Sequence, residues 1–459
     1  MLERILIKNT LNQTGEKVKI AGRVGARRDH GKLAFIDLID CSGILQVVLK
    51  EAEDLRLNDV IAIEGIINKR PENMINKEIE TGGIEMQAEK IEILNKADTT
   101  PFELNTDGHE VNEEIRLKYR YLDLRRNRLQ KNFKIRHQIT RFIRNFLSER
   151  DFTEIETPLL TKSTPEGARD YVVPSRLQPG KFYALPQSPQ QYKQLLMVAG
   201  FEKYFQIAKC FRDEDTRGDR QPEFTQLDME MSFVGQEEVM KLNEELVIET
   251  IKNVYPDKKF LQLPFPRISY KEAMEKYGTD RPDLRKDKNN QNELAFCWVV
   301  DFPFFEKDKG LNPDGSPKWT FTHNPFSAAA PGWHEKLMKK KDIEKIIAAQ
   351  YDVVLNGFEI GGGSIRNHKP EALKKVLEII GLKEKDIEEN FGHMLKALAF
   401  GAPPHGGIAF GLDRFIAILQ NEPNIREVIA FPKTGDGRDL MMNAPSEITK
   451  EQLKELGQL

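Results

Sequence analysis

Short runs of alternating apolar and polar residues occupy the first hundred positions of the chain. Five such runs lie between residues 16 and 95, namely VKIAGRV, KLAFIDLI, GILQVVL, DVIAIEGII and IEMQAEKIEIL. In the first run Val18 and Ile20 alternate with Lys19, as expected of a strand that has one buried and one wet face. Five strands in about eighty residues predict a small closed β-barrel within a domain that we place at residues 1–105.

A polar connector follows at residues 106–130 and ends in the basic stretch RLKYRYLDLRRNRL. We interpret it as a hinge or linker with a basic surface, and a merely solvated charge run is the alternative. Beyond it, Ile139, Phe142, Ile143 and Phe146 recur at helical spacing. This spacing predicts a long amphipathic helix that ends near Asp151.

The chain up to residue 432 mixes strand-like apolar runs such as YFQIAKCF, FCWVVDF and GGIAFG with helical segments. The strands follow one another without a regular βαβ rhythm, which favours an antiparallel sheet flanked by helices. The predicted fold class is therefore α+β, with the barrel followed by a second domain at residues 131–432 and a C-terminal extension at 433–459. No GxGxxG opens a βαβ unit and no GxxxxGK[ST] occurs, so the common mononucleotide-binding loops are excluded.

Composition narrows the class of protein. The 459 residues are 39% hydrophobic and 31% charged, which is typical of a soluble multidomain protein and not of a disordered chain. The net charge of −3 means that any nucleic-acid surface must be a local patch. Three cysteines without a CxxC pair, and no apolar run long enough to span a membrane, predict a cytoplasmic protein without structural zinc.

The densest chemical segment is CFRDEDTRGDRQPEFTQLDMEMSF. Its loop contains Arg212, Glu214, Arg217 and Arg220, and Phe224 enters the strand that follows. Arginines bind phosphate bidentately and an aromatic ring can stack on a purine, so the segment has the parts of a nucleoside triphosphate site. A surface ion-pair network is the alternative.

Two later segments add charged groups at turns. In DVVLNGFEIGGGSIR, a bend at Asn-Gly would let Asp352 and Glu359 converge on Mg²⁺, and a bulged edge strand is the alternative. In GGIAFGLDRFIAIL, Gly411 to Arg414 marks a strand-to-helix junction at which Arg414 could meet a phosphate or a purine face.

Taken together, these segments resemble the three ordered motifs of the class II aminoacyl-tRNA synthetases, and within them the bacterial aspartyl family, over nearly the whole chain. Motif 1 resembles the helix before FTEIETPLLTKSTPEGARDYVVPSR, with Pro158 as its proline; motif 2 is FRDED through PEFTQLDMEMSF, and motif 3 is GIAFGLDR. The resemblance implies ATP-dependent formation of aspartyl-adenylate, transfer of the aspartyl group to the 3′ end of tRNA(Asp), Mg²⁺ as the cofactor, and a homodimer built on motif 1.

The roles of the family's residues carry over by position. The residues implied to bind ATP are Arg212, Asp213, Glu214, Gln221, Phe224, Glu359, Gly411, Leu412, Asp413 and Arg414. The residues implied to bind aspartate are Glu166, Gln190, Gln191, Lys193, Arg212, His323 and Arg366. Arg212, Glu359 and Arg414 are implied to be catalytic, and Asp352 and Glu359 to hold Mg²⁺.

Selectivity for aspartate has a physical basis. An acidic side chain in a water-poor pocket needs cations to offset its desolvation, and we expect Lys193 and Arg366 to supply them. Asparagine would leave these cations uncompensated, and such rejection can reach about 10⁴-fold, so editing would be unnecessary.

The barrel resembles the family's anticodon-binding domain. The resemblance implies that Phe35 stacks on an anticodon base and that Arg28 and Gln46 contact its neighbours; from this segment alone, Phe35 could equally be a core residue. His30 stands where relatives restricted to tRNA(Asp) tend to have leucine, and Gly82 or Gly83 is the second such position. Histidine there resembles enzymes that also charge tRNA(Asn), which we state as a hypothesis.

The chain departs from the pattern of the resembling family at two places, and two other functions compete with the aspartyl one. Residues 286–295 form a short polar segment where bacterial relatives carry an inserted domain, and we expect aminoacylation to survive its loss. Asn324 follows His323 where many relatives have a second histidine. A lysyl or asparaginyl synthetase is disfavoured by Lys193 with Arg366, and a noncatalytic tRNA-binding paralogue is disfavoured by the intact ATP residues.

Overall fold

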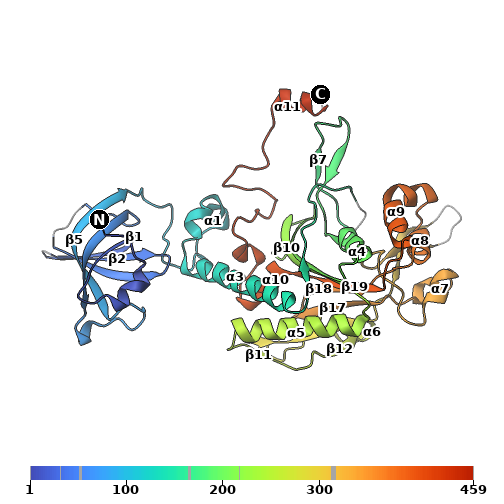
Figure 1. Ribbon diagram of the computed structural model, residues 1–459, viewed down its shortest axis with the longest axis horizontal. Helices are drawn as coiled ribbons and strands as arrows, with labels where there is room; N and C mark the ends of the chain where they lie inside the picture. Colours follow the sequence, from blue (N-terminus) through green and yellow to red (C-terminus); the bar gives the residue numbers. More distant parts are fainter. Residues whose placement is uncertain are drawn as a thin grey trace. The chain divides into compact units, whose positions relative to one another are not determined.

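The computed structural model describes residues 2–31, 33–50, 54–163, 167–216, 218–311 and 317–457. The chain divides into two compact units, residues 1–102 and 103–459 (Figure 1). Within the described residues, no helix is both long and apolar enough to cross a membrane.

The first unit is a closed five-stranded barrel, as the alternating runs predict. Its strands are β1 (Lys17–His30), β2 (Leu33–Asp40), β3 (Gly43–Leu49), β4 (Val60–Lys69) and β5 (Ile84–Asn95), in the order β1-β2-β3-β5-β4. Alternate residues such as Ile20, Ile36 and Leu38 point inward and are fully buried. Short 3₁₀ helices, η1 (Ile7–Asn12) and η2 (Glu72–Met74), complete this unit.

The second unit is built on an eight-stranded sheet that is mostly antiparallel, which confirms the predicted α+β class. In spatial order its strands are β12 (Arg267–Ser269), β14 (Phe296–Val300), β17 (Gln350–Leu355), β18 (Phe358–Ile365), β19 (His405–Gly411), β10 (Glu223–Ser232), β9 (Lys203–Phe211) and β6 (Thr153–Glu154). Among the described strands of this sheet, the pairs β12–β14 and β6–β9 are parallel and the others are antiparallel. Three further two-stranded sheets are β7 (Val172–Pro174) with β8 (Phe182–Ala184), β11 (Lys259–Phe260) with β13 (Glu293–Leu294), and β15 (Phe305–Leu311) with β16 (Pro317–Phe321).

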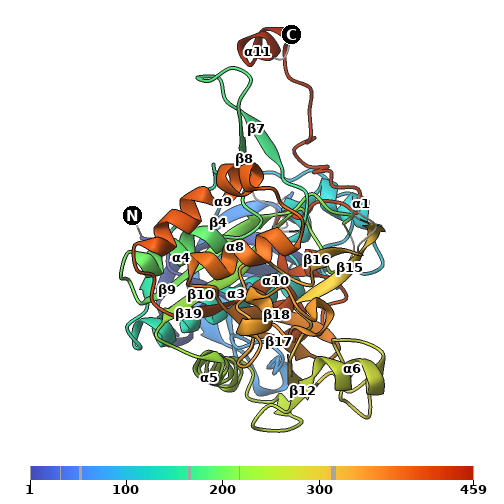
Figure 2. The same cartoon turned by 90° about the vertical axis from the view of Figure 1, so that its right-hand side faces the viewer.

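Helices cover both faces of this sheet. The helices of this unit are α1 (Glu113–Lys118), α2 (Arg120–Asp123), α3 (Asn127–Ser148), α4 (Gln190–Val198), α5 (Gln236–Val254), α6 (Tyr270–Tyr277), α7 (His334–Met338), α8 (Pro370–Ile379), α9 (Glu384–Ala399), α10 (Leu412–Leu419) and α11 (Lys450–Glu455), with 3₁₀ helices η3 (Ile343–Lys345) and η4 (Ile425–Val428). Helix α5 runs beneath one face of the sheet, and α4 lies on the opposite side with α9 beside it (Figure 2). Helix α3 ends at Ser148, close to the predicted end.

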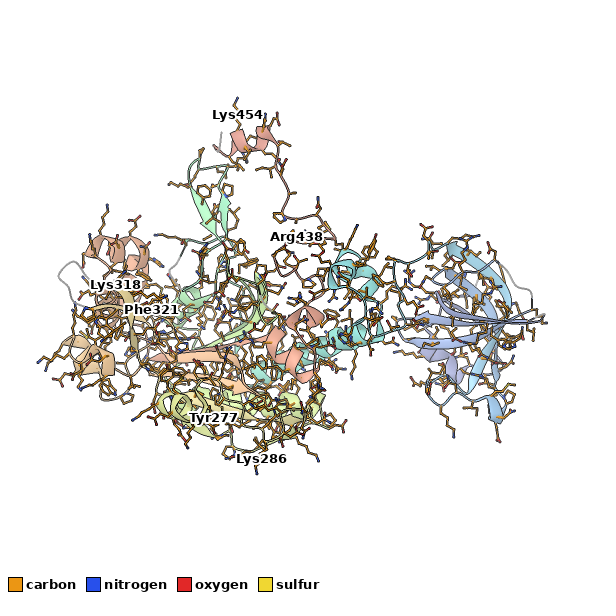
Figure 3. All side chains as sticks on the ribbon, turned by 180° about the vertical axis from the view of Figure 1, so that it is seen from behind. Tyr277, Lys286, Lys318, Phe321, Arg438 and Lys454 are labelled. Atoms are coloured by element: carbon orange, nitrogen blue, oxygen red, sulfur yellow. The ribbon has the colours of Figure 1, made fainter. Side chains whose placement is uncertain are left out.

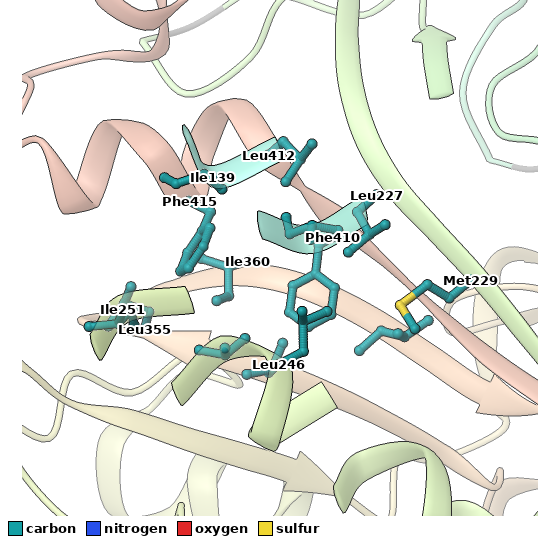
Figure 4. Close-up of a cluster of buried hydrophobic side chains, with 14 of the residues drawn as sticks. Ile139, Leu227, Met229, Leu246, Ile251, Leu355, Ile360, Phe410, Leu412 and Phe415 are labelled. Carbon is teal, nitrogen blue, oxygen red and sulfur yellow. The ribbon is translucent and has the colours of Figure 1, made fainter. Parts of the chain in front are cut away.

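The main hydrophobic core lies between the sheet and α3, α5 and α10. Leu227 and Met229 from β10 pack with Phe410 from β19, Leu246 from α5 and Phe415 from α10 (Figure 4). Because strand side chains alternate between faces, the residues between these apolar ones point to the opposite face, where the polar site lies.

The arginines of the connector do not form the basic surface that the sequence suggested. Arg116, Arg120 and Arg126 are buried, and all three contact the fully buried Asp123. Arg116 also pairs with Glu427 of η4 at 2.7 Å. The charge run is therefore a buried ion-pair network that ties α1 and α2 to the segment after α10.

The C-terminal segment lies over the loop that precedes β10. Thr216 of that loop donates a hydrogen bond to the carbonyl oxygen of Gly435, and Lys433 pairs with Asp439 at 3.4 Å. In the same segment Arg438 is exposed, and so is Lys454 of α11 (Figure 3). This segment thus contacts the loop containing the predicted nucleotide-binding residues.

Candidate active site

A cavity of about 440 Å³ opens on the polar face of the large sheet. Among the described residues, predicted site residues that line it are Gln190, Lys193, Arg212, Glu214, Gln221, Phe224, His323, Glu359, Arg366, Gly411, Asp413 and Arg414. They come from α4, β9–β10 and the intervening loop, the segment after β16, β18, and the β19–α10 junction. The structure therefore brings together in one place segments that lie more than two hundred residues apart.

Strand β10 places a row of polar side chains along the cavity. Leu227 and Met229 face the core, whereas Gln226, Asp228 and Glu230 project to the opposite face. Asp228 and Glu230 are both fully buried. Sequence reasoning missed these two carboxylates, although the alternation in QLDMEM could have indicated them.

The buried carboxylates pair with the two cations predicted to select the substrate. Lys193 Nζ lies 2.7 Å from Asp228 Oδ1 and 3.4 Å from Glu230 Oε2, and Arg366 Nε donates to Glu230 Oε1 at 3.0 Å. Gly407 lies opposite Glu230 in the sheet, and a Cβ there would fall 2.1 Å from Glu230 Oε2. The same Cβ would fall 2.0 Å from the Met229 carbonyl oxygen, so glycine at this position makes room for both the neighbouring backbone and the carboxylate.

Burial and the two cations set the charges in this cluster. Burial alone would raise the pKa of Glu230, but the charges of Arg366 and Lys193 outweigh it and lower the pKa below its usual range. For Asp228, burial dominates and raises the pKa, although Lys193 opposes it. Asp228 and Glu230 offset most of the charge of the two cations, so the cluster is close to electroneutral. The expectation that asparagine would leave these cations uncompensated is therefore wrong, because both already have carboxylate partners in the protein.

Asp352 and Glu359 converge as the Asn-Gly bend predicts. Asn356 and Gly357 have φ angles of 51° and 87°, and a bulge lies between Val353 and Val354. Both carboxylates approach Gly362, because a Cβ there would fall 2.8 Å from Asp352 Oδ1 and 3.6 Å from Glu359 Oε1. Burial, and then the charge of Glu359, raise the pKa of Asp352 well above its ordinary value.

The other half of the cavity carries arginines and an aromatic ring. The Arg212 guanidinium lies over the Phe224 ring, 5.1 Å from its centroid. Arg414 Nη1 donates to the Glu359 carbonyl oxygen at 2.5 Å, and Arg414 also contacts Asp219 at 3.4 Å. Guanidinium groups next to an aromatic ring suit a polyphosphate joined to a planar base.

Asp413 anchors this half to the scaffold. Its Oδ1 accepts a hydrogen bond from Arg136 of α3 at 2.5 Å, and its Oδ2 accepts one from the Thr225 backbone N–H at 2.7 Å. The side chain before Arg414 thus links α3, β10 and α10.

Several predicted residues lie elsewhere. Gln191 points away from the cavity and pairs with His393 of α9 at 2.6 Å, because it lies one residue from Gln190 on α4 and so faces a different direction. Asp213 is exposed and bonds through its backbone to Arg169, and Leu412 is buried in the core. Glu166 lies outside the described residues.

Gln221 borders the cavity, but both ends of its amide are engaged by the protein. Its Oε1 accepts from the Lys433 backbone N–H at 2.7 Å, and its Nε2 donates to the Lys433 carbonyl at 3.1 Å. In this structure the side chain holds the C-terminal segment, which differs from the expected contact with ATP.

His323 and Asn324 both border the cavity, with different surroundings. Burial lowers the pKa of His323 below its usual value, although nearby Glu359, Asp280 and Glu306 oppose this. Asn324 Oδ1 instead accepts a hydrogen bond from the Phe326 backbone N–H at 3.0 Å and so holds its own turn.

The barrel carries a separate polar face on β1, β2 and β3. Phe35 lies between the buried residues Ala34 and Ile36 and therefore points outward, which excludes the core interpretation. Its ring meets that of His30 edge-on at 5.7 Å. Arg28 binds Asp37 bidentately at 2.9 and 2.6 Å, and Gln46 donates to Glu85 at 2.8 Å, a carboxylate that sequence reasoning missed.

The two glycines of the ETGGIEM stretch differ in their surroundings. Gly82 is buried, and a Cβ there would fall 1.7 Å from the Asn76 carbonyl oxygen. Gly83 has open space around its Cα. Gly82 is thus required for packing of the β4–β5 connection.

Comparison with known families accords with this geometry. A model described as tRNA synthetases class II (D, K and N) matches residues 112–435, and one described as an OB-fold nucleic acid binding domain matches residues 18–94. The chain therefore belongs to the class II tRNA synthetases of this group.

Similar proteins indicate which members of this group the chain belongs with. The chain is 40% identical to the aspartate–tRNA ligase of Staphylococcus saprophyticus over 96% of both chains. It is also 40% identical to the aspartate–tRNA(Asp/Asn) ligase of Chlorobium chlorochromatii, over 97% of this chain and 94% of the relative. Within its class the chain thus belongs with the aspartate–tRNA ligases. The alignment with the first relative spans 576 residues, more than this chain contains, so that relative has residues without a counterpart here.

Solved structures share the fold. The asparaginyl-tRNA synthetase of Pyrococcus horikoshii in complex with asparaginyl-adenylate matches with a TM-score of 0.74 and 22% identity, over 95% of this chain and 99% of that one. The aspartyl-tRNA synthetase of Entamoeba histolytica matches with a TM-score of 0.71 and 22% identity, over 94% and 91%.

Proposed function

We propose that this protein joins L-aspartate to ATP, forming aspartyl-adenylate and pyrophosphate, and transfers the aspartyl group to the 3′ end of tRNA(Asp) and also of tRNA(Asn). The observation that carries the amino-acid assignment is the buried cluster of Lys193, Arg366, Asp228 and Glu230, which adjoins the arginine-lined half of the same cavity.

Arg366 is well placed to select a carboxylate. Within the part of the chain that the structure describes, four of its five N–H groups are engaged, by Glu230 twice and by Ser364 and the Gly407 carbonyl, which leaves one Nη1–H for a ligand. Because Glu230 and Ser364 fix the guanidinium plane, the remaining N–H has a defined direction. A carboxylate oxygen accepts this hydrogen bond with charge assistance, whereas the neutral amide oxygen of asparagine accepts it without that assistance.

The two steps need positioning and charge stabilisation. In the first, an oxygen of the aspartate α-carboxylate attacks the α-phosphorus of ATP; a C–O–P linkage forms and the bond to the β-phosphate bridging oxygen breaks. In the second, a terminal ribose hydroxyl of the tRNA attacks the acyl carbon and AMP leaves. Arg212 would stabilise charge on the α-phosphate, Phe224 and Arg414 would enclose adenine, and no protein nucleophile is required.

Mg²⁺ fits the carboxylate pair at Gly362. Asp352 and Glu359 offer the hard oxygen ligands that this cation takes together with phosphate oxygens. Burial, and then the charge of Glu359, raise the pKa of Asp352, and a cation bound between the two carboxylates would relieve their repulsion. When bound, Mg²⁺ would neutralise charge on the phosphate chain.

Two assembly features belong to the proposal. Pro158, Leu159 and Leu160 form an exposed apolar run after edge strand β6, with Leu159 and Leu160 46% and 52% exposed, which supports a homodimer contact there. On the barrel, outward-facing Phe35 beside His30 supports anticodon stacking and the relaxed tRNA choice.

The test is aspartate charging of separate tRNA(Asp) and tRNA(Asn) transcripts with ATP and Mg²⁺. We expect kcat/KM values for the two tRNAs within about tenfold of each other, since His30 replaces the residue of the restricted enzymes. Charging of tRNA(Asp) alone would keep the ligase and reject the relaxed specificity. Charging of neither, with no pyrophosphate exchange, would favour a noncatalytic tRNA-binding protein.

A further inference from the structure

A line of buried side chains runs from the interior to the cavity wall through α4 and β19. His405 and Gln194 are fully buried, and Gln190, one helical turn before Gln194, borders the cavity with 8% of its surface exposed. His405 Nδ1 lies 2.7 Å from the Pro403 carbonyl oxygen, and His405 Nε2 lies 3.2 Å from Gln194 Nε2. Gln190 Nε2 lies 3.1 Å from Gln194 Oε1.

The backbone carbonyl at one end sets the direction of every hydrogen bond in this line. A carbonyl oxygen can only accept, so His405 must carry its proton on Nδ1, and Nε2 of the neutral ring is then an acceptor. Gln194 therefore turns its N–H₂ towards His405 and its carbonyl oxygen towards Gln190. That oxygen accepts an N–H of Gln190, which leaves the Gln190 carbonyl oxygen on the cavity side.

When the carbonyl oxygen of Gln190 is held on the cavity side, it can bind a donor group of the amino acid but not an acceptor group. Both carboxylates of aspartate are acceptors, and its ammonium is its only donor. Gln190 lies one turn from Lys193, which together with Arg366 is placed for a carboxylate. The fixed orientation of Gln190 thus matches the ammonium end of the substrate.

We propose that His405 and Gln194 are positioning residues that lock the amide of Gln190 with its carbonyl oxygen towards the substrate ammonium. This inference rests on the proposed aspartate-activating function and adds two residues that touch neither substrate nor ATP.

The surroundings of His405 favour the neutral ring that this relay requires. Burial lowers its pKa, with Glu230 opposing the shift and Arg366 and His368 adding to it. Its cross-strand neighbour on β10 is the uncharged Ser232, and on the β18 side the Arg366 backbone N–H bonds to the His405 carbonyl. A protonated ring would donate from Nε2, reverse Gln194, and turn the N–H₂ of Gln190 towards the substrate.

The experiment compares His405→Phe, Gln194→Met and Gln194→Glu in aspartate-dependent pyrophosphate exchange, with succinate as a competitive inhibitor that lacks the ammonium. In His405→Phe and Gln194→Met the Gln190 amide can rotate, so we expect the KM for aspartate to rise about tenfold while kcat and the Ki of succinate stay within about twofold. In Gln194→Glu the new carboxylate still accepts a hydrogen bond from Gln190, so the KM of this variant for aspartate should stay within about threefold of the wild-type value.

His393→Phe is the matched control, because it breaks the other glutamine–histidine pair of α4, with Gln191, outside the cavity. It should leave the KM for aspartate unchanged. Equal rises in KM and in the Ki of succinate, or an unchanged KM in Gln194→Met, would overturn the relay alone. A wild-type protein without aspartate-dependent exchange would instead overturn the proposed function on which the relay depends.

Discussion

Arg366 and Glu230 show how two charged side chains are stabilised when they are buried as a pair. Each would be costly to bury alone, and their pairing at 3.0 Å offsets that cost while fixing the direction of the guanidinium. Glu230 does not stand out in the sequence, because glutamate is common on surfaces. Lys193 and Arg366 were predictable from their motifs, whereas their carboxylate partners depended on strands that meet only in the folded sheet.

Arg366→Leu should lower kcat/KM for aspartate by about 100-fold or more, because the substrate carboxylate loses its fixed donor. The same change leaves Glu230 buried without its partner, so the thermal midpoint should also fall. The double variant Arg366→Leu/Glu230→Gln removes both charges and should regain stability without regaining exchange. Near-normal exchange in a folded double variant would reject the role of Arg366.

At the scale of elements, the buried charge network fastens α1 and α2 to η4. Glu427 accepts hydrogen bonds from Arg116 at 2.7 Å and from Arg128 at 2.9 Å. Burial alone would raise its pKa, but the hydrogen bond and charge of Arg116, with Arg128 and Arg120, outweigh burial and lower the pKa to about 2. The charge run was visible in the sequence, but its burial was not, because the partner lies some three hundred residues away.

Glu427→Gln should lower the free energy of unfolding by about 3 kcal/mol near neutral pH. Because the folded pKa lies below the ordinary value of about 4.3, the wild-type carboxylate contributes fully above that pH and loses its contribution as pH falls towards 2. The difference between variant and wild type should therefore shrink below about pH 4.5 in denaturant unfolding at several pH values. Glu447→Gln, at an exposed position, is the control, and an equal effect of both changes would contradict the ion-pair explanation.

At the scale of the whole molecule, the barrel face with Phe35 and the polar cavity belong to different compact units of the chain. The barrel has its own closed core, and every described residue that lines the cavity belongs to the second unit. A substitution on the outer barrel face should therefore affect reactions that involve tRNA and spare adenylate formation.

Phe35→Ala tests this separation. Loss of one stacking platform costs about 1–3 kcal/mol, so kcat/KM for tRNA(Asp) should fall roughly 5- to 150-fold while aspartate-dependent pyrophosphate exchange stays unchanged. Phe35→Trp keeps an aromatic face and should retain most of the charging activity. Equal impairment of charging and exchange in Phe35→Ala would instead indicate a defect in folding.

The sequence by itself determined the barrel, the α+β class and most of the cavity, because alternation, helical spacing and motif residues are local patterns that report local structure. Tertiary structure alone decided which charges are buried together: Asp228 and Glu230 with Lys193 and Arg366, and Asp123 with the connector arginines. It also decided that Gln191 pairs with a side chain of α9 and that Gln221 bonds to the backbone of the C-terminal segment. The physical reason is that the cost of burying a charged or polar group depends on partners brought close by folding, and those partners lie far away in the sequence.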